Sequence, residues 1–212
     1  HDFFRDHFNY FDALERAAEA LGAEEPCEPY EMLAALKKRL HRRHSIEVET
    51  RPVEKMRDSL RIFDSASGVI QLSEALDYQN RSFRLAHILC FVELSDILSD
   101  ITSGLKVDSK PAVARCHVEL ANYFAAAVLM PYDAFHAMAE QSGYDIDRMA
   151  SAFAVSFEQV CQRLTTLQRE TKRGVPFFFL RVDKAGNVTK RFNATSFNIA
   201  EYGGSCPVWN LH

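Results

Sequence analysis

A predicted helix around residues 84–91 constrains this chain more than any other segment. It reads Arg-Leu-Ala-His-Ile-Leu-Cys-Phe and lies within an apolar stretch, residues 82–100, that has helical spacing. Positions 87 and 91 lie one turn apart, which is the spacing of the two ligands in the His-Glu-x-x-His helix of zinc peptidases. His87 occupies the first ligand position, but Ile88 stands in place of the general base and Phe91 in place of the second ligand. We therefore predict that this helix neither holds zinc in the usual way nor activates a water.

The segments around this helix predict an α+β fold. Residues 45–51 alternate apolar and charged side chains, as a half-buried strand does. A hairpin is expected next, with strands at 60–63 and 69–72 around the turn-forming residues 64–68. Beyond the helix predicted at residues 82–100, which we call the motif helix, another helix is expected. It runs from about residue 108 or 109 to Pro131, with Pro111 in its first turn. Periodicity alone predicts only this α+β class.

Two helices are predicted before the first strand. Apolar residues at helical spacing indicate one helix that ends at Gly22, namely Phe4, Phe8, Phe11, Leu14, Ala18 and Leu21. A second helix is expected over residues 30–43, and the basic cluster Lys37–His44 closes it. Cations are favoured at a helix carboxyl end without any functional role. The alternative interpretation is an anion site for ligand phosphates, or a surface that docks on DNA or another subunit.

Three stretches of the chain resemble known families. Glu119–Pro131, which reads ELANYFAAAVLMP, resembles the alanine-rich helix of ImmA/IrrE-type peptidase domains. Residues 174–192 and 203–212 resemble the short-chain fatty acyl transcriptional regulators, which include bacterial regulators of propionyl-CoA metabolism, and the similarity covers nearly the whole chain. The resemblance implies a mainly helical zincin-like core with a small antiparallel sheet and a C-terminal β-hairpin. The expected parts are an N-terminal helical segment at 1–44, a degenerate zincin-like core at 45–175, and the hairpin with the start of a truncated module at 176–212.

Composition narrows the class of protein. Apolar residues make up 47% and charged residues 25%, as in globular proteins, and no apolar run is long enough to span a bilayer. The net charge of −4 argues against a nucleic-acid-binding module as a whole. Five well-separated cysteines without a CxxC pair predict reduced thiols in a cytoplasm. The first residues are not a signal peptide and lack an initiator Met, so we expect a fragment of a longer chain.

Residues 146–164 are typical of a helix-turn-helix. Ser156 can cap the second helix, with Gln159 at the capping-box position. A DNA-reading helix needs basic and amide groups in its first exposed turn, whereas this one begins with Phe157 and Glu158. We therefore favour two packed core helices, and the resemblance places DNA recognition in a separate N-terminal helix-turn-helix domain that is not in this chain.

The candidate ligand-binding residues lie on two elements. The hairpin Phe177–Phe192 combines aromatic with cationic side chains, which suits a nucleotide-bearing ligand, and we choose Phe178, Arg181, Lys190 and Arg191 from it. The alternative for this hairpin is a strand buried on both faces with a solvated basic edge. The motif helix adds Arg84, His87 and Phe91. For His87 we favour a hydrogen-bonded core histidine over a residual ligand.

A metal site receives little support. Cys206 and His212 are the weak candidates, and two ligands alone do not make a site. The resemblance implies that an iron–sulfur cluster is possible only with a cysteine-rich C-terminal region absent here.

The resemblance implies a ligand-sensing domain of a bacterial transcriptional regulator whose effector is a short-chain acyl-CoA such as propionyl-CoA. Two alternatives remain: a residual ImmA/IrrE-type metallopeptidase, which Ile88 and Phe91 disfavour, and a ligand-free dimerisation domain. The Phe-rich start could supply a subunit interface, so a homo-oligomer is expected.

Overall fold

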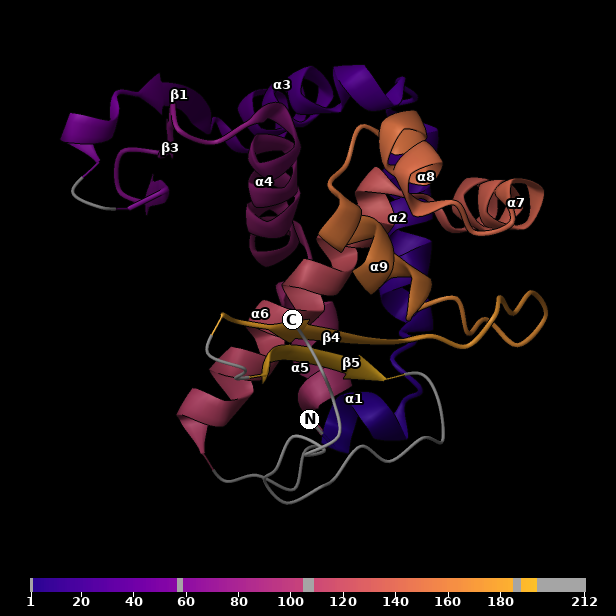
Figure 1. Ribbon diagram of the computed structural model, residues 1–212. Coiled ribbons are helices and arrows are strands. Elements are labelled where there is room, and N and C mark those ends of the chain that lie inside the picture. The colour runs from indigo at the N-terminus through magenta and orange to yellow at the C-terminus, as the bar shows by residue number, and fades with distance from the viewer. Residues whose placement is uncertain (1, 57–58, 105–108, 185–187, 194–212) are drawn as a thin grey trace. The chain divides into compact units, whose positions relative to one another are not determined.

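A computed structural model of the chain describes residues 2–56, 59–104, 109–184 and 188–193 (Figure 1). The chain divides into two compact units. One consists of residues 12–160, and the other consists of residues 1–11 together with 161–212.

The larger unit is mainly helical and carries one small sheet. In chain order its elements are α2 (Asp12–Glu24), η1 (Pro29–Glu31), α3 (Met32–His44), β1 (Glu47–Arg51), η2 (Val53–Lys55), β2 (Arg61–Asp64), β3 (Val69–Ser73), α4 (Tyr78–Glu93), α5 (Ser95–Thr102), α6 (Lys110–Leu129), α7 (Tyr132–Ser142) and α8 (Ile146–Phe153). Helix α9 (Phe157–Leu164) follows and continues into the smaller unit. The smaller unit also contains α1 (Asp2–Asp6), β4 (Phe178–Val182) and β5 (Val188–Asn193). The expected α+β class is confirmed.

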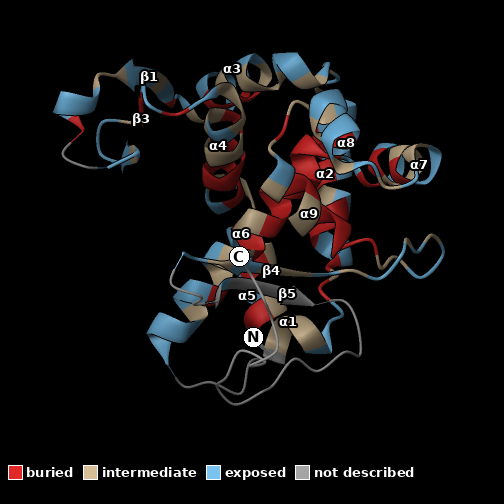
Figure 2. Ribbon diagram, in the orientation of Figure 1, coloured by how far each residue is buried: buried red, intermediate tan, exposed pale blue. Residues whose placement is uncertain are grey.

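Helix α4 lies at the centre of the core of the larger unit. It packs on α6 and α3, and α2 packs on α6 as well. Figure 2 shows the buried residues concentrated where α2, α4 and α6 meet. Leu85 and Leu89 of α4 are fully buried, and small Ala121 and Ala125 of α6 are too. The burial of these alanines shows that the alanine-rich stretch of α6 belongs to the core. Because alanine side chains are short, they let α4 and α6 approach closely.

The small sheet is mixed, whereas the sequence predicted an antiparallel one. Its strand order is β1-β3-β2, with β3 parallel to β1 and antiparallel to β2. A short turn joins β2 to β3, and these two strands pair with each other, while β3 pairs with β1 along its other edge. The apolar β3, with Ile70 and Leu72 buried, is the central strand for this reason.

Gly68 closes the β2–β3 turn in a left-handed conformation, with φ +66. A Cβ at this position would lie 3.2 Å from the backbone oxygen of Ser45, just before β1. Gly68→Ala is therefore expected to lower the free energy of unfolding by about 1–2 kcal/mol, measured by urea denaturation.

Gly22→Ala is the matched control for that substitution. Gly22 lies inside α2, and nothing would contact its added Cβ within 4 Å. The expected change is a gain of about 0.5–1 kcal/mol, because alanine favours a helix interior. Equal effects of the two substitutions would contradict the role of the turn. The prediction that Gly22 is a C-cap is wrong, since α2 continues to Glu24.

The start of the chain is not one continuous helix. Helix α1 ends at Asp6, and Phe8 and Asn9 then take left-handed φ values of 51 and 52. The Asn9 side chain donates a hydrogen bond to Oγ1 of Thr165 at 2.8 Å in the interior of the smaller unit. Asparagine tolerates this backbone conformation better than most residues. The hydrogen bond to Thr165 holds the chain in this left-handed turn, and the helix predicted from the apolar spacing is therefore interrupted. Phe8 consequently points to solvent, with 67% of its surface exposed.

The helix-turn-helix-like segment forms the expected pair of helices, α8 and α9. The predicted capping box is present: the amide of Gln159 donates to the Ser156 hydroxyl at 3.2 Å, and the amide of Ser156 donates to the Gln159 side chain at 2.8 Å. Arg163 of α9 is fully buried and cannot reach DNA phosphates. This burial supports the interpretation as packed core helices.

The structure divides the helix predicted at residues 82–100 in two. Helix α4 ends at Glu93, and after Leu94 a second helix, α5, begins at Ser95. Among the described residues, no helix is both long and apolar enough to cross a membrane.

Candidate functional site around His87

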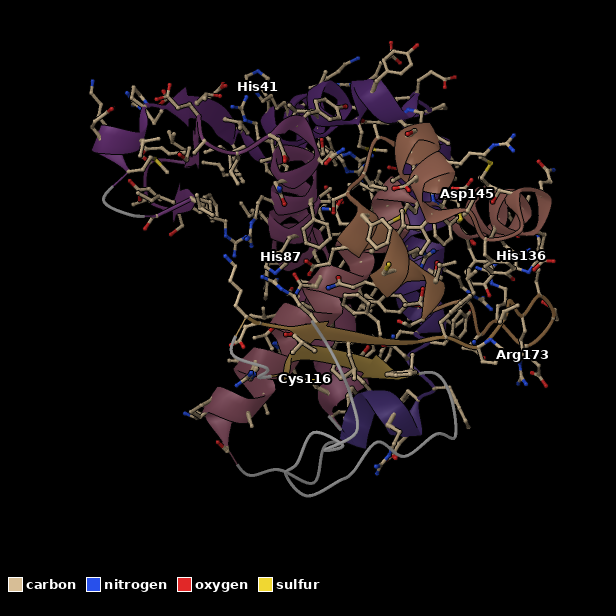
Figure 3. The ribbon with its side chains drawn as sticks, in the orientation of Figure 1. His41, His87, Cys116, His136, Asp145 and Arg173 are labelled. Atoms are coloured by element: carbon tan, nitrogen blue, oxygen red, sulfur yellow. The ribbon has the colours of Figure 1, made fainter. Side chains whose placement is uncertain are left out.

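His87 lies in the carboxyl-terminal half of α4 (Figure 3) and is only 1% exposed. Its Nδ1 lies 2.9 Å from a terminal nitrogen of Arg61 on β2, and its ring also hydrogen-bonds the backbone of Val118 on α6. A guanidinium can only donate, so Nδ1 must be the unprotonated nitrogen. Nε2 then carries the hydrogen and donates it to the Val118 carbonyl. His87 is thus a hydrogen-bonded core histidine that joins β2, α4 and α6.

The positive charges of two arginines act on this neutral ring. Burial, then the positive charges of Arg61 and Arg84, lower the pKa of His87 to about 4, and the Val118 hydrogen bond offsets only part of this. Burial, followed by the charge of Arg84, also lowers the pKa of Arg61. Within the described part of the chain, neither Arg61 nor Arg84 forms an ion pair with a carboxylate. The positive charge beside His87 therefore remains available to an anion.

Apolar side chains accompany these cations. The Phe91 ring lies one turn beyond His87, with the two ring centroids 5.3 Å apart, and 39% of Phe91 is exposed. Val118 is 41% exposed. Phe63 is 40% exposed and shares a strand face with Arg61, because the two pair with Ile70 and Leu72 of β3. The arrangement combines uncompensated cations with accessible apolar surface, which suits an anion that carries an apolar group.

The structure brings together Arg84, His87 and Phe91, which the sequence singled out, and adds Arg61, which it did not. Arg61 was missed because nothing local distinguishes it from any other charged residue at the start of a strand. Only the packing of the sheet beside α4 shows that it reaches His87. A sequence signal that could have pointed to Arg61 is the alternation of side chains along a strand. It places positions 61 and 63 on the same face of the sheet as the buried residues of β3.

The other predicted ligand residues belong to the smaller unit. Phe178 and Arg181 are exposed on β4, which pairs with β5 in the predicted antiparallel hairpin. Arg181 lies opposite Lys190 in the register, and Leu180 lies opposite Arg191. Their part in ligand binding stays a prediction. Cys206 and His212 fall outside the described residues.

Part of the basic cluster 37–44 is paired with acidic side chains of α2 and α4. Arg39, 5% exposed, donates to both oxygens of Glu93 at 2.9 and 2.7 Å and to Glu24 at 2.8 Å. Arg43 also pairs with Glu24 at 2.9 Å, and His44 lies 2.8 Å from Glu93. These ion pairs tie α2, α3 and α4 together. The interpretation of this cluster as a phosphate site is therefore disfavoured for Arg39 and Arg43.

The described residues contain no group of three or more His, Cys, Asp or Glu side chains that could hold a metal ion. Cys90, close to His87 in the chain, is fully buried, and burial raises the pKa of its thiol to about 12. A thiol in this state stays protonated and is a poor metal ligand.

Comparison with known proteins agrees with this architecture. Residues 41–165 match the family model of the IrrE N-terminal-like domain, and residues 166–212 match that of the short-chain fatty acyl coenzyme A regulator, C-terminal. A solved structure of a Mycobacterium tuberculosis transcriptional regulator aligns with a TM-score of 0.92 and 40% identity, over 98% of this chain and 63% of that chain.

Three curated relatives match along the whole chain. The HTH-type transcriptional regulators PrpR and RamB of Mycobacterium tuberculosis are 40% and 37% identical, and the propionyl-CoA carboxylase regulator of Cereibacter sphaeroides is 36% identical. The chain spans 43–44% of the length of these relatives. The chain therefore belongs to the IrrE N-terminal-like domain family over residues 41–165, and its residues 166–212 are similar to the C-terminal part of short-chain fatty acyl coenzyme A regulators.

Proposed function

We propose that this chain is the ligand-sensing part of a bacterial transcriptional regulator and that its effector is a short-chain acyl-CoA such as propionyl-CoA. The observation that carries the proposal is the uncompensated pair Arg61 and Arg84 beside neutral His87, with Phe91 and Val118 accessible next to it. The phosphates of CoA need cations, and a short acyl chain needs apolar surface. The family and the names of the relatives support the same ligand class.

DNA recognition is assigned to a separate helix-turn-helix domain of the regulator. Two relatives are named as HTH-type regulators, and this chain matches less than half of their length. The burial of Arg163 supports this division, because it leaves α9 poorly suited to contact phosphates. We also propose that the regulator acts in the cytoplasm as a homo-oligomer, and that an iron–sulfur cluster, where one is present, uses a cysteine-rich region beyond this chain.

A residual peptidase is the weaker candidate function. Ile88 is apolar and 5% exposed, so it offers no general base, and Phe91 offers no ligand atom. His87 already uses both ring nitrogens in hydrogen bonds to Arg61 and Val118. A catalytic zinc keeps three protein ligands and one open position, which this helix cannot supply by itself.

Calorimetric titration with propionyl-CoA tests the proposal. We expect the wild-type chain to bind, and Arg84→Gln to weaken binding about ten- to a hundredfold, because one charge-assisted phosphate contact is lost. Acetyl- and butyryl-CoA should compete, since an apolar pocket distinguishes one methylene by only about 1–3 kcal/mol.

Two further variants complete this experiment. Arg148→Gln, an exposed arginine on α8, is the charge-matched control and should bind like wild type. Arg181→Gln tests the hairpin independently: a large loss there with none at Arg84 would move the phosphate site to β4. The absence of any binding heat with folded wild-type chain would contradict the proposed ligand.

A further inference from the structure

Arg61 is held in place on a strand that is otherwise exposed. Ile62, Phe63 and Asp64 of β2 are all exposed, whereas Arg61 is partly buried and donates to Nδ1 of His87 at 2.9 Å. His87 is fixed in turn by its hydrogen bond to the backbone of Val118. An exposed arginine on an edge strand normally samples many rotamers, and this chain of hydrogen bonds selects one of them.

The partner of Arg61 is chemically unusual. A buried guanidinium normally pairs with a carboxylate, which cancels its charge. Here the acceptor is a neutral imidazole, so the guanidinium keeps its full charge and its remaining N–H donors. Arg84, three residues before His87, lies on the same side of α4 and adds a second positive charge. The positive charge of Arg84 disfavours that of Arg61, and an anion that pairs with both arginines relieves this repulsion.

We propose that Arg61 and Arg84 together bind a phosphate or diphosphate group, and that His87 is a positioning residue that orients Arg61 for this contact. This inference rests on the proposed function for the identity of the whole ligand, but the anion site itself does not depend on the acyl group. A multiply charged phosphate group suits the site because each guanidinium can donate two parallel hydrogen bonds to phosphate oxygens.

A purely structural role for His87 makes a different prediction. If the ring serves only to fill the space between α4, β2 and α6, every polar replacement should act through stability alone. If His87 positions Arg61, the acceptor at the Nδ1 position is what matters. Asparagine places its carboxamide near the position of Nδ1, whereas glutamine places it near that of Nε2. The two variants therefore separate the contact with Arg61 from the contact with Val118.

The experiment measures the affinity of the folded chain for propionyl-CoA and, separately, for inorganic pyrophosphate. Both should bind to wild type, and Arg61→Gln should weaken both about ten- to a hundredfold. His87→Asn should stay close to wild type, and His87→Gln should lose about tenfold. In the Arg61→Gln background, His87→Gln should cause no further loss, because the two residues act as a unit. Urea denaturation of each variant confirms that it is folded.

Each outcome decides the proposal. The pattern above with both ligands supports it. The same pattern with pyrophosphate alone keeps the anion site and rejects the acyl-CoA effector. Binding of propionyl-CoA that is unchanged in Arg61→Gln overturns the anion site and leaves the proposed function intact. Equal losses in His87→Asn and His87→Gln, or additive losses in the double variant, overturn the positioning role. Failure of both ligands to bind to wild type overturns the anion site and the effector together.

Discussion

Arg39→Met is expected to lower the free energy of unfolding by about 3–5 kcal/mol, measured by urea denaturation followed by circular dichroism. Arg39 is 5% exposed and bonds both oxygens of Glu93 and one oxygen of Glu24. Methionine fills a similar volume but leaves the Glu93 carboxylate, itself only 15% exposed, without its main partner. The cost therefore arises from an uncompensated charge near the core rather than from a cavity.

Arg42→Met is the matched control, because Arg42 is exposed on the same helix. Its expected effect is within about 0.5 kcal/mol of wild type. Replacing both partners, as Arg39→Met with Glu93→Leu, should recover much of the loss, since no buried charge then remains. A double variant that is less stable than Arg39→Met would contradict this explanation.

The same network predicts a response to acid. Burial raises the pKa of Glu93, but the hydrogen bonds from Arg39 and His44 outweigh it, and the net shift is downward. A carboxylate with a lowered pKa stabilises the fold above its ordinary value of 4.5, and this contribution is lost as the pH falls below that value.

Because of His87, the free energy of unfolding should decrease as the pH falls from 6.5 to 4. This pH range lies above the one in which Glu93 acts. Its pKa is about 4 when folded against 6.5 for an ordinary histidine, so the unfolded chain binds the proton more readily. The stability is complete above pH 6.5 and is lost as the pH falls toward 4. The full loss is about 3 kcal/mol, of which about 2 kcal/mol should be gone at pH 5.

Urea denaturation of wild type and His87→Asn between pH 8 and pH 4.5 measures this effect. Asparagine does not titrate, so the variant should lose the part of the pH dependence that lies above pH 4.5. The difference in unfolding free energy between the two proteins should therefore change with pH. A constant difference across the range would show that His87 is not held neutral by its surroundings.

The sequence by itself determined the class of fold and most of its elements. The turn residues 64–68 predicted the β2–β3 hairpin, Pro111 predicted the first turn of α6, and Ser156 with Gln159 predicted the start of α9. These features depend on interactions between residues close in the chain, which a local pattern records directly. The spacing of His87 and Phe91 likewise placed both residues on one side of α4.

The tertiary structure determined which residues that are distant in the chain come into contact. The sheet order depends on the pairing of β1 with β3 rather than with β2, the next strand in the chain. The left-handed turn at Asn9 depends on Thr165, far away in the chain. Lys37–His44 looked like one uniform basic cluster, yet Glu93 and Glu24 bury and neutralise Arg39 while leaving Arg42 exposed. Arg61 became part of the candidate site only because β2 lies beside α4. Contacts between distant residues set burial and charge pairing, and no local pattern encodes them.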